Sequence, residues 1–508
     1  MVVTVRSLGL NGIAGYAVSA ECFLSGGLPA FDIVGLPDAA VREARERVRA
    51  AVKNCGAKFP VSRITVNLAP AGQKKAGTVY DLPIFVGLLA AGRELPPPAQ
   101  QAAFIGELSL TGALRGVTGV LPMALAARDA GVKELYVPAE NAAEATLAGG
   151  LTVYGVPDVG ALVRHLRGEE RLSPASAWVP EAEEAAGPDL RDVMGQENAR
   201  RALEIAAAGG HNLLLIGSPG AGKSMLAKRL PSILPDMSRE EALEVSGIWS
   251  VAGLADPQHP LLTRRPFRSP HHSISTAGLI GGGRPVHPGE ISLAHGGVLF
   301  LDELAEFPTG VLQTLRQPIE RGYVRIVRVD GAFTFPSRFQ LLAASNPCPC
   351  GFLGDREVPC RCSASMVERY RAKLRGPLAD RIDMMIDVTR PDPQVIIEGA
   401  EGMSSAELRD YVVRGRAFRA WRESRMDDAD AEAEDDETRS IDGVVSTFEL
   451  DDAAEKCVLG LSKRTHLTGR GIVRLVRIAR TIADVAESEQ VTHDHVLEAA
   501  MYQGRRDQ

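Results

Sequence analysis

The sequence predicts an α/β protein with three parts: an amino-terminal α/β domain, a nucleotide-binding α/β core and a helical carboxy-terminal domain. Strand-like and helix-like runs alternate through residues 1–168. From residue 189 a helix, an apolar strand, a Gly-rich loop and a second helix follow one another, which is the opening of a nucleotide-binding core. The 508 residues, 45% of them hydrophobic and 24% charged, suit a globular chain of about three domains.

The amino-terminal domain, residues 1–168, is expected to contain both strands and helices. Its best-defined helix is 37–54, because Val41, Ala44, Val48 and Val52 recur at helical spacing and Asp38 stands near the start. The other expected elements are strands at 2–5, 16–22 and 64–68 and helices at 81–91 and 121–130. Residues 169–188 are acidic and rich in small side chains, as in an exposed linker.

The bulk charge limits the choice of partners. A formal net charge of −7 is not that of a protein that coats nucleic acid, so any DNA binding must come from local basic loops. The first residues have no signal-peptide pattern, and no apolar run approaches the ~20 residues of a membrane span. We therefore expect a cytoplasmic protein without a membrane partner.

An almost wholly acidic or Ala run within 424–440 is expected to be a disordered loop in the helical domain, residues 393–508.

A complete P-loop pattern lies between an apolar strand, 213–216, and a helix that begins near 225. In this context a chance glycine turn is a poor alternative. Glycines let backbone N–H groups approach phosphates, Lys223 would neutralise the β- and γ-phosphate oxygens of ATP, and the Ser224 hydroxyl would bind Mg²⁺. The pattern consists of Gly217, Ser218, Pro219, Gly220, Ala221, Gly222, Lys223 and Ser224.

Two further strands of the core, which spans 189–392, end in polar side chains. The strand 298–301 is followed by Asp302, expected to hold the Mg²⁺ water shell, and by Glu303, expected to polarise the attacking water. The strand 339–345 ends at Asn346, whose amide can orient that water; an ordinary turn Asn before a proline is the alternative.

Arg381 follows on a helix-to-strand turn and could reach the phosphate of a neighbouring subunit. A surface salt bridge with Asp380 or Asp383 remains the alternative for this arginine.

Four cysteines cluster within the loop 347–363: Cys348, Cys350, Cys360 and Cys362. Two close pairs of thiols favour a structural zinc site over four free thiols, because Zn²⁺ takes four soft ligands in a tetrahedron. Since all four positions are filled, no hydrolytic role is implied; the metal would stiffen the loop. The histidines His271, His272, His287 and His295 have no ligand spacing and are expected to make polar contacts near the nucleotide or channel.

A β-hairpin is predicted at 323–335, where two runs of β-branched and aromatic residues flank Asp330-Gly331. Arg325 and Arg328 lie on its first strand at odd spacing, so they would face different sides. Both arginines would contact DNA phosphates; the alternative is that they are solvated strand residues. Contact with DNA is favoured for Arg328, near the tip.

Six blocks together resemble the YifB/ComM family of magnesium-chelatase-like AAA+ ATPases: GSPGAGKS, GVLFLDELAEF, LRQPIERG, AASNPCPCG, GPLADRID and VRIARTIAD. The resemblance implies an AAA+ core with a helical lid, a hexameric ring and a DNA helicase that drives branch migration in natural transformation. It gives the P-loop, Asp302, Glu303 and Asn346 the roles stated above, and it makes Arg381 the trans finger and Arg470 the lid sensor. Here Gly471 stands where the family often has Ala.

The resemblance also identifies two insertions. The Gly-rich stretch 275–290, with Arg284, looks like a helix-2 insert that projects into the ring channel, and the hairpin looks like a pre-sensor hairpin. Basic residues on both would contact DNA. The alternative is a motor that remodels a polypeptide, but such motors usually carry an aromatic pore loop, and 278–283 has no aromatic residue. An ATP-gated switch is disfavoured because a pure binder needs no Glu303.

The amino-terminal domain resembles the proteolytic domain of Lon at 106–112 and 121–131. The positions of the Lon nucleophile and base fall on or near Val79 and Leu121, so no peptidase activity is expected and DNA binding or substrate docking is favoured. Arginines 42, 45, 47 and 49 could supply positive surface. Because they alternate with Glu43 and Glu46, a solvated face of paired charges is the safer expectation.

Overall fold

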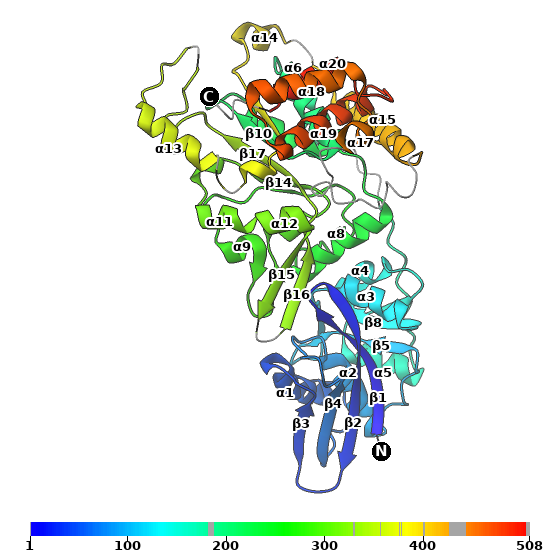
Figure 1. The fold of residues 1–508 in the computed structure, drawn as a ribbon. Coiled ribbons are helices and arrows are strands. Elements are labelled where there is room, and N and C mark those ends of the chain that lie inside the picture. Colours follow the sequence, from blue (N-terminus) through cyan, green and yellow to red (C-terminus); the bar gives the residue numbers. More distant parts are fainter. Residues whose placement is uncertain are drawn as a thin grey trace.

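The computed structural model describes residues 2–180, 187–328, 331–355, 357–374, 376, 378–399, 402–425 and 443–503. The predicted acidic loop lies outside the described residues from 426 onward, as do residues 181–186 of the predicted linker. Figure 1 shows an elongated molecule with the amino-terminal α/β part at one end and the carboxy-terminal helices at the other. None of the helices that can be described is both long and apolar enough to span a bilayer.

The amino-terminal part is a seven-stranded mixed sheet covered by helices. Its strand order is β3-β4-β2-β1-β5-β8-β9. The strands are β1 (Val2–Asn11), β2 (Ala14–Ser25), β3 (Ala30–Val34), β4 (Arg63–Ala69), β5 (Ala102–Phe104), β8 (Glu134–Pro138) and β9 (Thr152–Val156), with a small hairpin of β6 (Glu107–Leu108) and β7 (Leu114–Arg115). The helices are α1 (Ala39–Asn54), α2 (Asp81–Ala91), α3 (Val120–Asp129), α4 (Ala142–Thr146) and α5 (Val159–Arg167).

Helix α1 begins where the sequence predicts a cap. The Asp38 carboxylate accepts a hydrogen bond from the Val41 backbone N–H at 2.9 Å, which satisfies one of the free donors of the first turn. The apolar stripe of α1 is buried, whereas α2 is buried along its whole length. Strands β1 and β2 are longer than predicted, because they pair antiparallel from Val2–Phe23 to Asn11–Ala14 and close through a two-residue turn that includes Gly12 at φ 65°.

The core contains a five-stranded parallel sheet of order β11-β14-β17-β10-β18. The strands are β11 (Phe267–Arg268), β14 (Val298–Leu301), β17 (Gln340–Ser345), β10 (Leu213–Ile216) and β18 (Met384–Asp387), and the neighbouring helices are α6 (Glu197–Gly209), α7 (Lys223–Ile233), α8 (Arg239–Val251) and α13 (Ala364–Leu374). In a parallel sheet all carboxyl ends meet at one edge, so the segments after β10, β14 and β17 converge there.

Two insertions interrupt this core between β11 and β17. The first contains α9 (Thr276–Ile280), β12 (Gly281–Gly282), β13 (His287–Pro288) and α10 (Glu290–Leu293). After α11 (Thr309–Thr314) and α12 (Arg316–Arg321) comes the hairpin of β15 (Tyr323–Arg328) and β16 (Gly331–Pro336). The prediction of Asp-Gly as its central pair was wrong: Gly331 pairs with Arg328 and belongs to the strand, while residues 329 and 330 lie outside the described part of the chain.

The carboxy-terminal part is helical. It comprises α14 (Pro393–Glu398), α15 (Ser405–Glu423), α17 (Val444–Thr447), α18 (Asp452–Thr465), α19 (Gly469–Val485) and α20 (His493–Met501). Buried residues of α15, α19 and α20 form one hydrophobic cluster with α6, α7 and strand β10. The helical part therefore packs directly on the five-stranded sheet, as Figure 1 also shows.

Among the described residues, two contacts between the amino-terminal part and the core involve the start of α3 and the β1–β2 turn. At the first, the Gly119 N–H donates to the Ser250 carbonyl at 3.1 Å, and the Ser250 hydroxyl donates to the buried Glu144. At the second, the β1–β2 turn reaches the hairpin β15–β16: a Cβ at Gly12 would lie 3.4 Å from the Thr334 carbonyl oxygen, and Ile13 packs against the hydrophobic cluster under the hairpin. In Figure 1 the hairpin points toward this turn.

Candidate nucleotide site

The P-loop joins β10 to α7 at the carboxyl edge of the sheet. Gly220 and Gly222 have φ angles of 79° and 89°, in the left-handed region that side chains other than glycine rarely adopt. A Cβ at Gly217 would lie 2.2 Å from the Val388 carbonyl oxygen. The backbone geometry thus requires glycine at all three of these positions. Because glycine has no side chain, the loop stays open to phosphate oxygens.

The Lys223 ammonium is held over the loop by neutral oxygens. It donates to the carbonyls of Gly217 and Ser218 at 2.6 and 3.0 Å and to Asn346 Oδ1 at 3.2 Å. Burial lowers the pKa of Lys223, and the nearby carboxylates of Asp302 and Glu303 oppose this shift. A phosphate that took the place of these carbonyl oxygens would form a charge-assisted hydrogen bond with the desolvated Lys223 ammonium.

The Ser224 hydroxyl donates to Asp302 Oδ2 at 2.7 Å. A hydroxyl at the start of α7 and a carboxylate after β14 therefore lie side by side. Such hard oxygen atoms suit Mg²⁺, which is held by one or two protein oxygens together with water and phosphate. Asn346 lies at the end of the neighbouring strand β17, and its contact with Lys223 brings it into the same site. The structure therefore brings together the predicted residues Lys223, Ser224, Asp302 and Asn346.

Glu303 is at the same edge in an unusual backbone conformation. Its φ of 52° is left-handed, and its side chain is 56% exposed. His272 Nδ1 lies 3.4 Å from Glu303 Oε2, and the His271 ring is 4.0 Å from the His272 ring, centroid to centroid. One of the predicted polar histidines is thus beside the candidate catalytic carboxylate. His295 instead is buried near the start of β14, 3.3 Å from Glu244.

The four cysteines form one cluster, and their Sγ atoms all lie within 4.8 Å of one another. The Sγ–Sγ distances from Cys348 to Cys350 and Cys360 are 3.4 and 3.7 Å, and Cys350 to Cys360 is 3.5 Å. A tetrahedral Zn²⁺ with bonds of about 2.3 Å separates its sulfur ligands by about 3.8 Å, so the donor set fits zinc. Backbone N–H groups of Arg361 and Phe352 lower the pKa of Cys350 to about 6.

The cysteine loop packs against the P-loop. The sequence alone did not predict this contact. A Cβ at Gly351 would lie 2.7 Å from Pro219 Cδ, and Asp355 interacts with the Ser218 hydroxyl. Arg390 bridges the two loops: its Nη2 donates to the Pro219 carbonyl at 3.2 Å, and its Nε lies 3.6 Å from an Asp355 oxygen. No spacing rule connects Arg390 to residues so distant in the chain.

Gln196 is a second P-loop partner that the sequence analysis missed. Its Nε2 donates to the Ala221 carbonyl at 3.2 Å and to the Thr389 carbonyl at 2.5 Å. Gln196 is buried just before α6, so it ties the start of the core to the phosphate loop.

Arg381 lies at the opposite edge of the sheet. It ends a short 3-10 helix (Ala379–Arg381) before β18, and its carbonyl accepts from Asn212 Nδ2 at 2.8 Å, just before β10. Its guanidinium forms an ion pair with Glu320 of α12, and the Arg381 side chain is only 9% exposed. Because β10 runs from Asn212 toward the P-loop, Arg381 is about a strand length, roughly 13 Å or more, from its own phosphate site.

Arg470 is near the same edge. It is exposed in the first turn of α19, one turn before Arg474, whose Nη2 donates to the Asp380 carbonyl at 2.9 Å. Residues four apart share a helix face, so Arg470 projects from the end of α19 that meets the Arg381 turn. Through Arg474, the helix that carries Arg470 contacts the turn that carries Arg381.

The three predicted DNA-contacting arginines are exposed on the two insertions. Arg325 and Arg328 are on β15, and Arg284 follows β12. Arg328 Nη1 donates to the Gly283 carbonyl at 2.9 Å, which links the hairpin to the first insertion beside Arg284. The structure therefore brings Arg328 and Arg284 to one place, with Arg325 on the same strand.

Three family models match separate parts of the chain. The family model described as magnesium chelatase, subunit ChlI, matches residues 189–396, the model for subunit ChlI of Mg-chelatase matches 20–141, and the ChlI C-terminal model matches 402–503. Proteins named YifB and ComM also match this chain, at 41% and 42% identity over nearly its full length. The chain belongs to their magnesium-chelatase-like family.

Full-length relatives agree with this family. An uncharacterized protein of Mycobacterium tuberculosis is 42% identical over 98% of this chain and 97% of its own length. The uncharacterized protein YifB of Escherichia coli is 41% identical over 99% and 96%, and the competence protein ComM of Haemophilus influenzae is 42% identical over 98% and 96%. The archaeal Lon protease of Methanothermobacter thermautotrophicus is 40% identical over 73 residues, 14% of this chain, so the likeness to Lon is partial.

Proposed function

We propose that this family member is a ring-forming, ATP-dependent DNA motor, a helicase that promotes branch migration in recombination and natural transformation. The observation that carries the proposal is the division of the site between the two edges of one sheet. The Lys223–Asn346 and Ser224–Asp302 contacts lie at the carboxyl edge, and the buried Arg381 lies at the other. Two copies in head-to-tail contact would unite these halves, and repetition of that contact generates a closed ring when the rotation between neighbours closes.

Hydrolysis would use these side chains in distinct roles. Lys223 moves its hydrogen bonds from carbonyl oxygens to the β- and γ-phosphates, and Ser224 and Asp302 hold Mg²⁺, which neutralises charge on the phosphates when bound. Asn346 orients the attacking water. Glu303 leaves the neighbourhood of His272 and accepts a hydrogen bond from that water. The neighbouring subunit supplies Arg381, after release from Glu320, and Arg470 acts as the sensor of the lid.

The link to DNA rests on the two insertions. Arg328, Arg325 and Arg284 are exposed on a hairpin and a Gly-rich loop that touch each other through the Arg328–Gly283 bond. Exposed guanidinium groups of this kind suit sequence-independent contact with phosphates. The name of the relative ComM, a competence protein, agrees with a role in natural transformation.

We further propose a domain division that follows the sequence prediction: a Lon-like domain at 1–168, a linker at 169–188, an AAA+ core at 189–392 and a lid at 393–508. In this scheme a structural Zn²⁺ on Cys348, Cys350, Cys360 and Cys362 stiffens the loop that supports the P-loop. A hexamer is the ring size that the family suggests.

The test is steady-state ATP hydrolysis with and without single-stranded, forked and four-way-junction DNA, with Glu303→Gln as the control. Stimulation by forked or junction DNA that is lost in the control is the expected result. Active basal turnover that no DNA changes would contradict a DNA motor and favour the alternative, a motor that acts on a polypeptide.

A further inference from the structure

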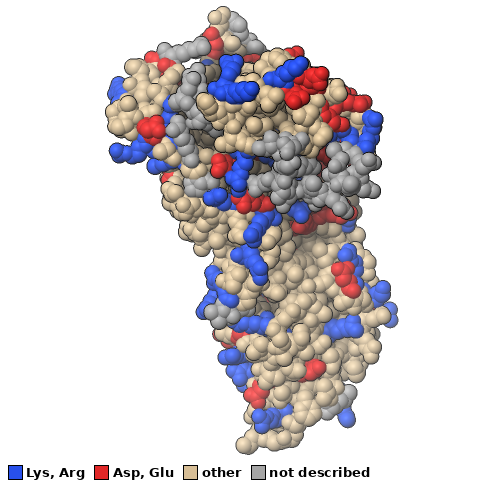
Figure 2. Space-filling view, viewed as in Figure 1, with Lys and Arg blue, Asp and Glu red and all other residues tan. Residues whose placement is uncertain are grey.

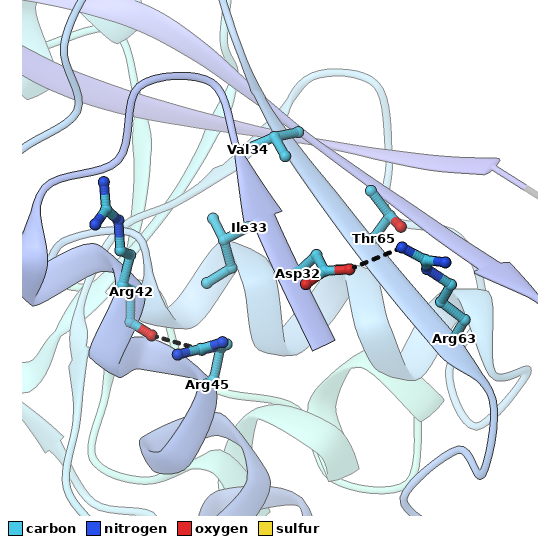
Figure 3. A pocket seen from close by; sticks show the side chains of 7 residues that line it. All are labelled: Asp32, Ile33, Val34, Arg42, Arg45, Arg63 and Thr65. Atoms are coloured by element: carbon cyan, nitrogen blue, oxygen red, sulfur yellow. Dashed lines mark hydrogen bonds and ion pairs between the residues drawn. The ribbon is translucent and has the colours of Figure 1, made fainter. Parts of the chain in front are cut away.

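A hollow of about 360 Å³ lies at the edge of the amino-terminal sheet (Figure 3). Arg42 and Arg45 approach it from α1, Asp32 from the edge strand β3, and Arg63 and Thr65 from β4. Figure 3 shows Arg42 and Arg45 on one side of β3 and the Asp32–Arg63 pair on the other. Its volume is in the range of small-ligand clefts, and its lining carries three guanidinium groups and one carboxylate.

The arginines of α1 divide into two classes, which the sequence could not distinguish. Arg47 pairs with Asp81 at 2.6 Å and Arg49 with Glu46 at 3.8 Å. In the part of the chain that the structure describes, no carboxylate lies within ion-pair distance of Arg42 or Arg45. The expected face of paired charges was therefore wrong for these two arginines, which are the two that line the hollow.

The hydrogen bonds of Arg45 fix the orientation of its side chain without neutralising its charge. Its Nε donates to the Arg42 carbonyl at 3.0 Å and its Nη1 to the Phe31 carbonyl at 3.3 Å. Both acceptors are neutral, so the positive charge stays available at the hollow. Across the edge strand, Arg63 Nη2 lies 3.4 Å from Asp32, which leaves the four charged groups with a positive balance.

The chemistry of the lining favours a phosphodiester chain as the ligand. Guanidinium groups on two sides match phosphate oxygens in a bidentate manner, and the Thr65 hydroxyl is a further donor. The lining has no aromatic side chain on which a base could stack, so recognition would be of the backbone and independent of sequence. An acidic peptide added as a strand fits less well, because β3 is short and Arg45 already takes its Phe31 carbonyl.

We propose that this hollow, which we call the β3-edge pocket (Arg42, Arg45, Arg63 and Thr65), binds phosphates of single-stranded nucleic acid. This inference deepens the proposed DNA motor and rests on it: the amino-terminal domain would hold the strand outside the core. Figure 2 agrees, since Lys and Arg side chains outnumber Asp and Glu over the margin of the molecule where α1 lies.

The test measures binding of a fluorescent oligothymidylate to the full chain at several salt concentrations. The double variant Arg42→Gln/Arg45→Gln should bind more weakly than the wild type. The slope of log Kd against log salt should be smaller than that of the wild type by about 1.4. Each phosphate contact on a single strand contributes about 0.7 to this slope, and the variant removes two. Arg49→Gln is the matched control: it removes a paired arginine from the same helix and should bind like the wild type.

Binding and turnover separate the two proposals. DNA-stimulated ATP hydrolysis together with wild-type affinity and salt slope in the double variant would overturn the pocket and leave the motor intact. Binding that depends on Arg42 and Arg45 without any stimulation would support the pocket and contradict the motor. Displacement of the probe by oligoglutamate, with no salt-slope difference between the variants, would overturn the pocket in favour of a protein partner. Thermal unfolding of each variant shows whether weaker binding reflects loss of the fold.

Discussion

Gly351→Ala is the substitution that tests most directly whether the cysteine loop supports the P-loop. Gly351 has a φ of 85°, and a Cβ there would lie 2.7 and 2.8 Å from Cδ and Cγ of Pro219. Gly354 offers a control within the same loop, because its φ is 79° and a Cβ would meet nothing within 4 Å.

The two variants share one cost and differ in another. A left-handed conformation costs an alanine about 1–2 kcal/mol at either position. Only Gly351→Ala also crowds the ring of Pro219, and overpacking of this kind costs about 1–3 kcal/mol more. The ring can relieve that contact only by shifting the P-loop, so part of the cost should appear as weaker nucleotide binding. At 1.4 kcal/mol for each tenfold change, we expect a Kd for ATP about 5- to 100-fold above that of Gly354→Ala.

The assay is binding of a fluorescent ATP analogue with Mg²⁺, together with the thermal midpoint of each variant. Both variants should lose thermal stability, Gly351→Ala more than Gly354→Ala because it alone crowds Pro219, and only Gly351→Ala should lose affinity for the ATP analogue. Equal ATP affinity in the two variants would show that the P-loop does not depend on the position of the cysteine loop, and the reasoning from this contact would fail.

Three other perturbations have defined outcomes. Cys360→Ser should abolish retention of zinc in metal analysis and weaken ATP binding, whereas unchanged ATP affinity in the metal-free variant would contradict a supporting role. Arg381→Ala should lower kcat by about 10³-fold or more, and mixing it with Glu303→Gln should restore turnover, because one variant supplies Glu303 and the other Arg381 to a shared site; no recovery would contradict a finger in trans. Burial raises the pKa of Glu144, so the stability that this group contributes is complete below its unfolded pKa of about 4.3 and is lost as the pH rises through the raised value. Thermal melts should therefore show Glu144→Gln gaining stability relative to the wild type as the pH rises through that window, and a constant difference would contradict it.

The arrangement of the candidate nucleotide site along one edge of the sheet could be predicted from the sequence, because this part of the fold depends on local order. A strand, a loop with glycines at positions of positive φ and a helix follow one another without interruption at Gly217–Ser224. The carboxyl ends of β14 and β17 then reach the same edge because the sheet is parallel. Asp302 and Asn346 needed no long-range information beyond this topology.

Contacts between distant segments were beyond the reach of the sequence. Arg390 and Gln196 meet the P-loop through packing of the cysteine loop and the start of α6, and Glu320 meets Arg381 from another element. The lengths of β1 and β2 were underestimated for a related reason, since their outer halves are stabilised by pairing with each other rather than by a hydrophobic run.

The place where the β1–β2 turn meets the hairpin β15–β16 constrains any motion of that hairpin. Ile13 is part of the packing around the hydrophobic cluster that contains Val324, Ile326 and Phe335, so the turn and the hairpin share one apolar contact. Packed apolar groups shift between discrete arrangements rather than deform continuously. A hairpin that tilts with the nucleotide state must therefore either carry the amino-terminal domain with it or expose Ile13. The buried Glu144–Ser250 contact opposes free separation of the two parts, which makes joint movement the less costly of these outcomes.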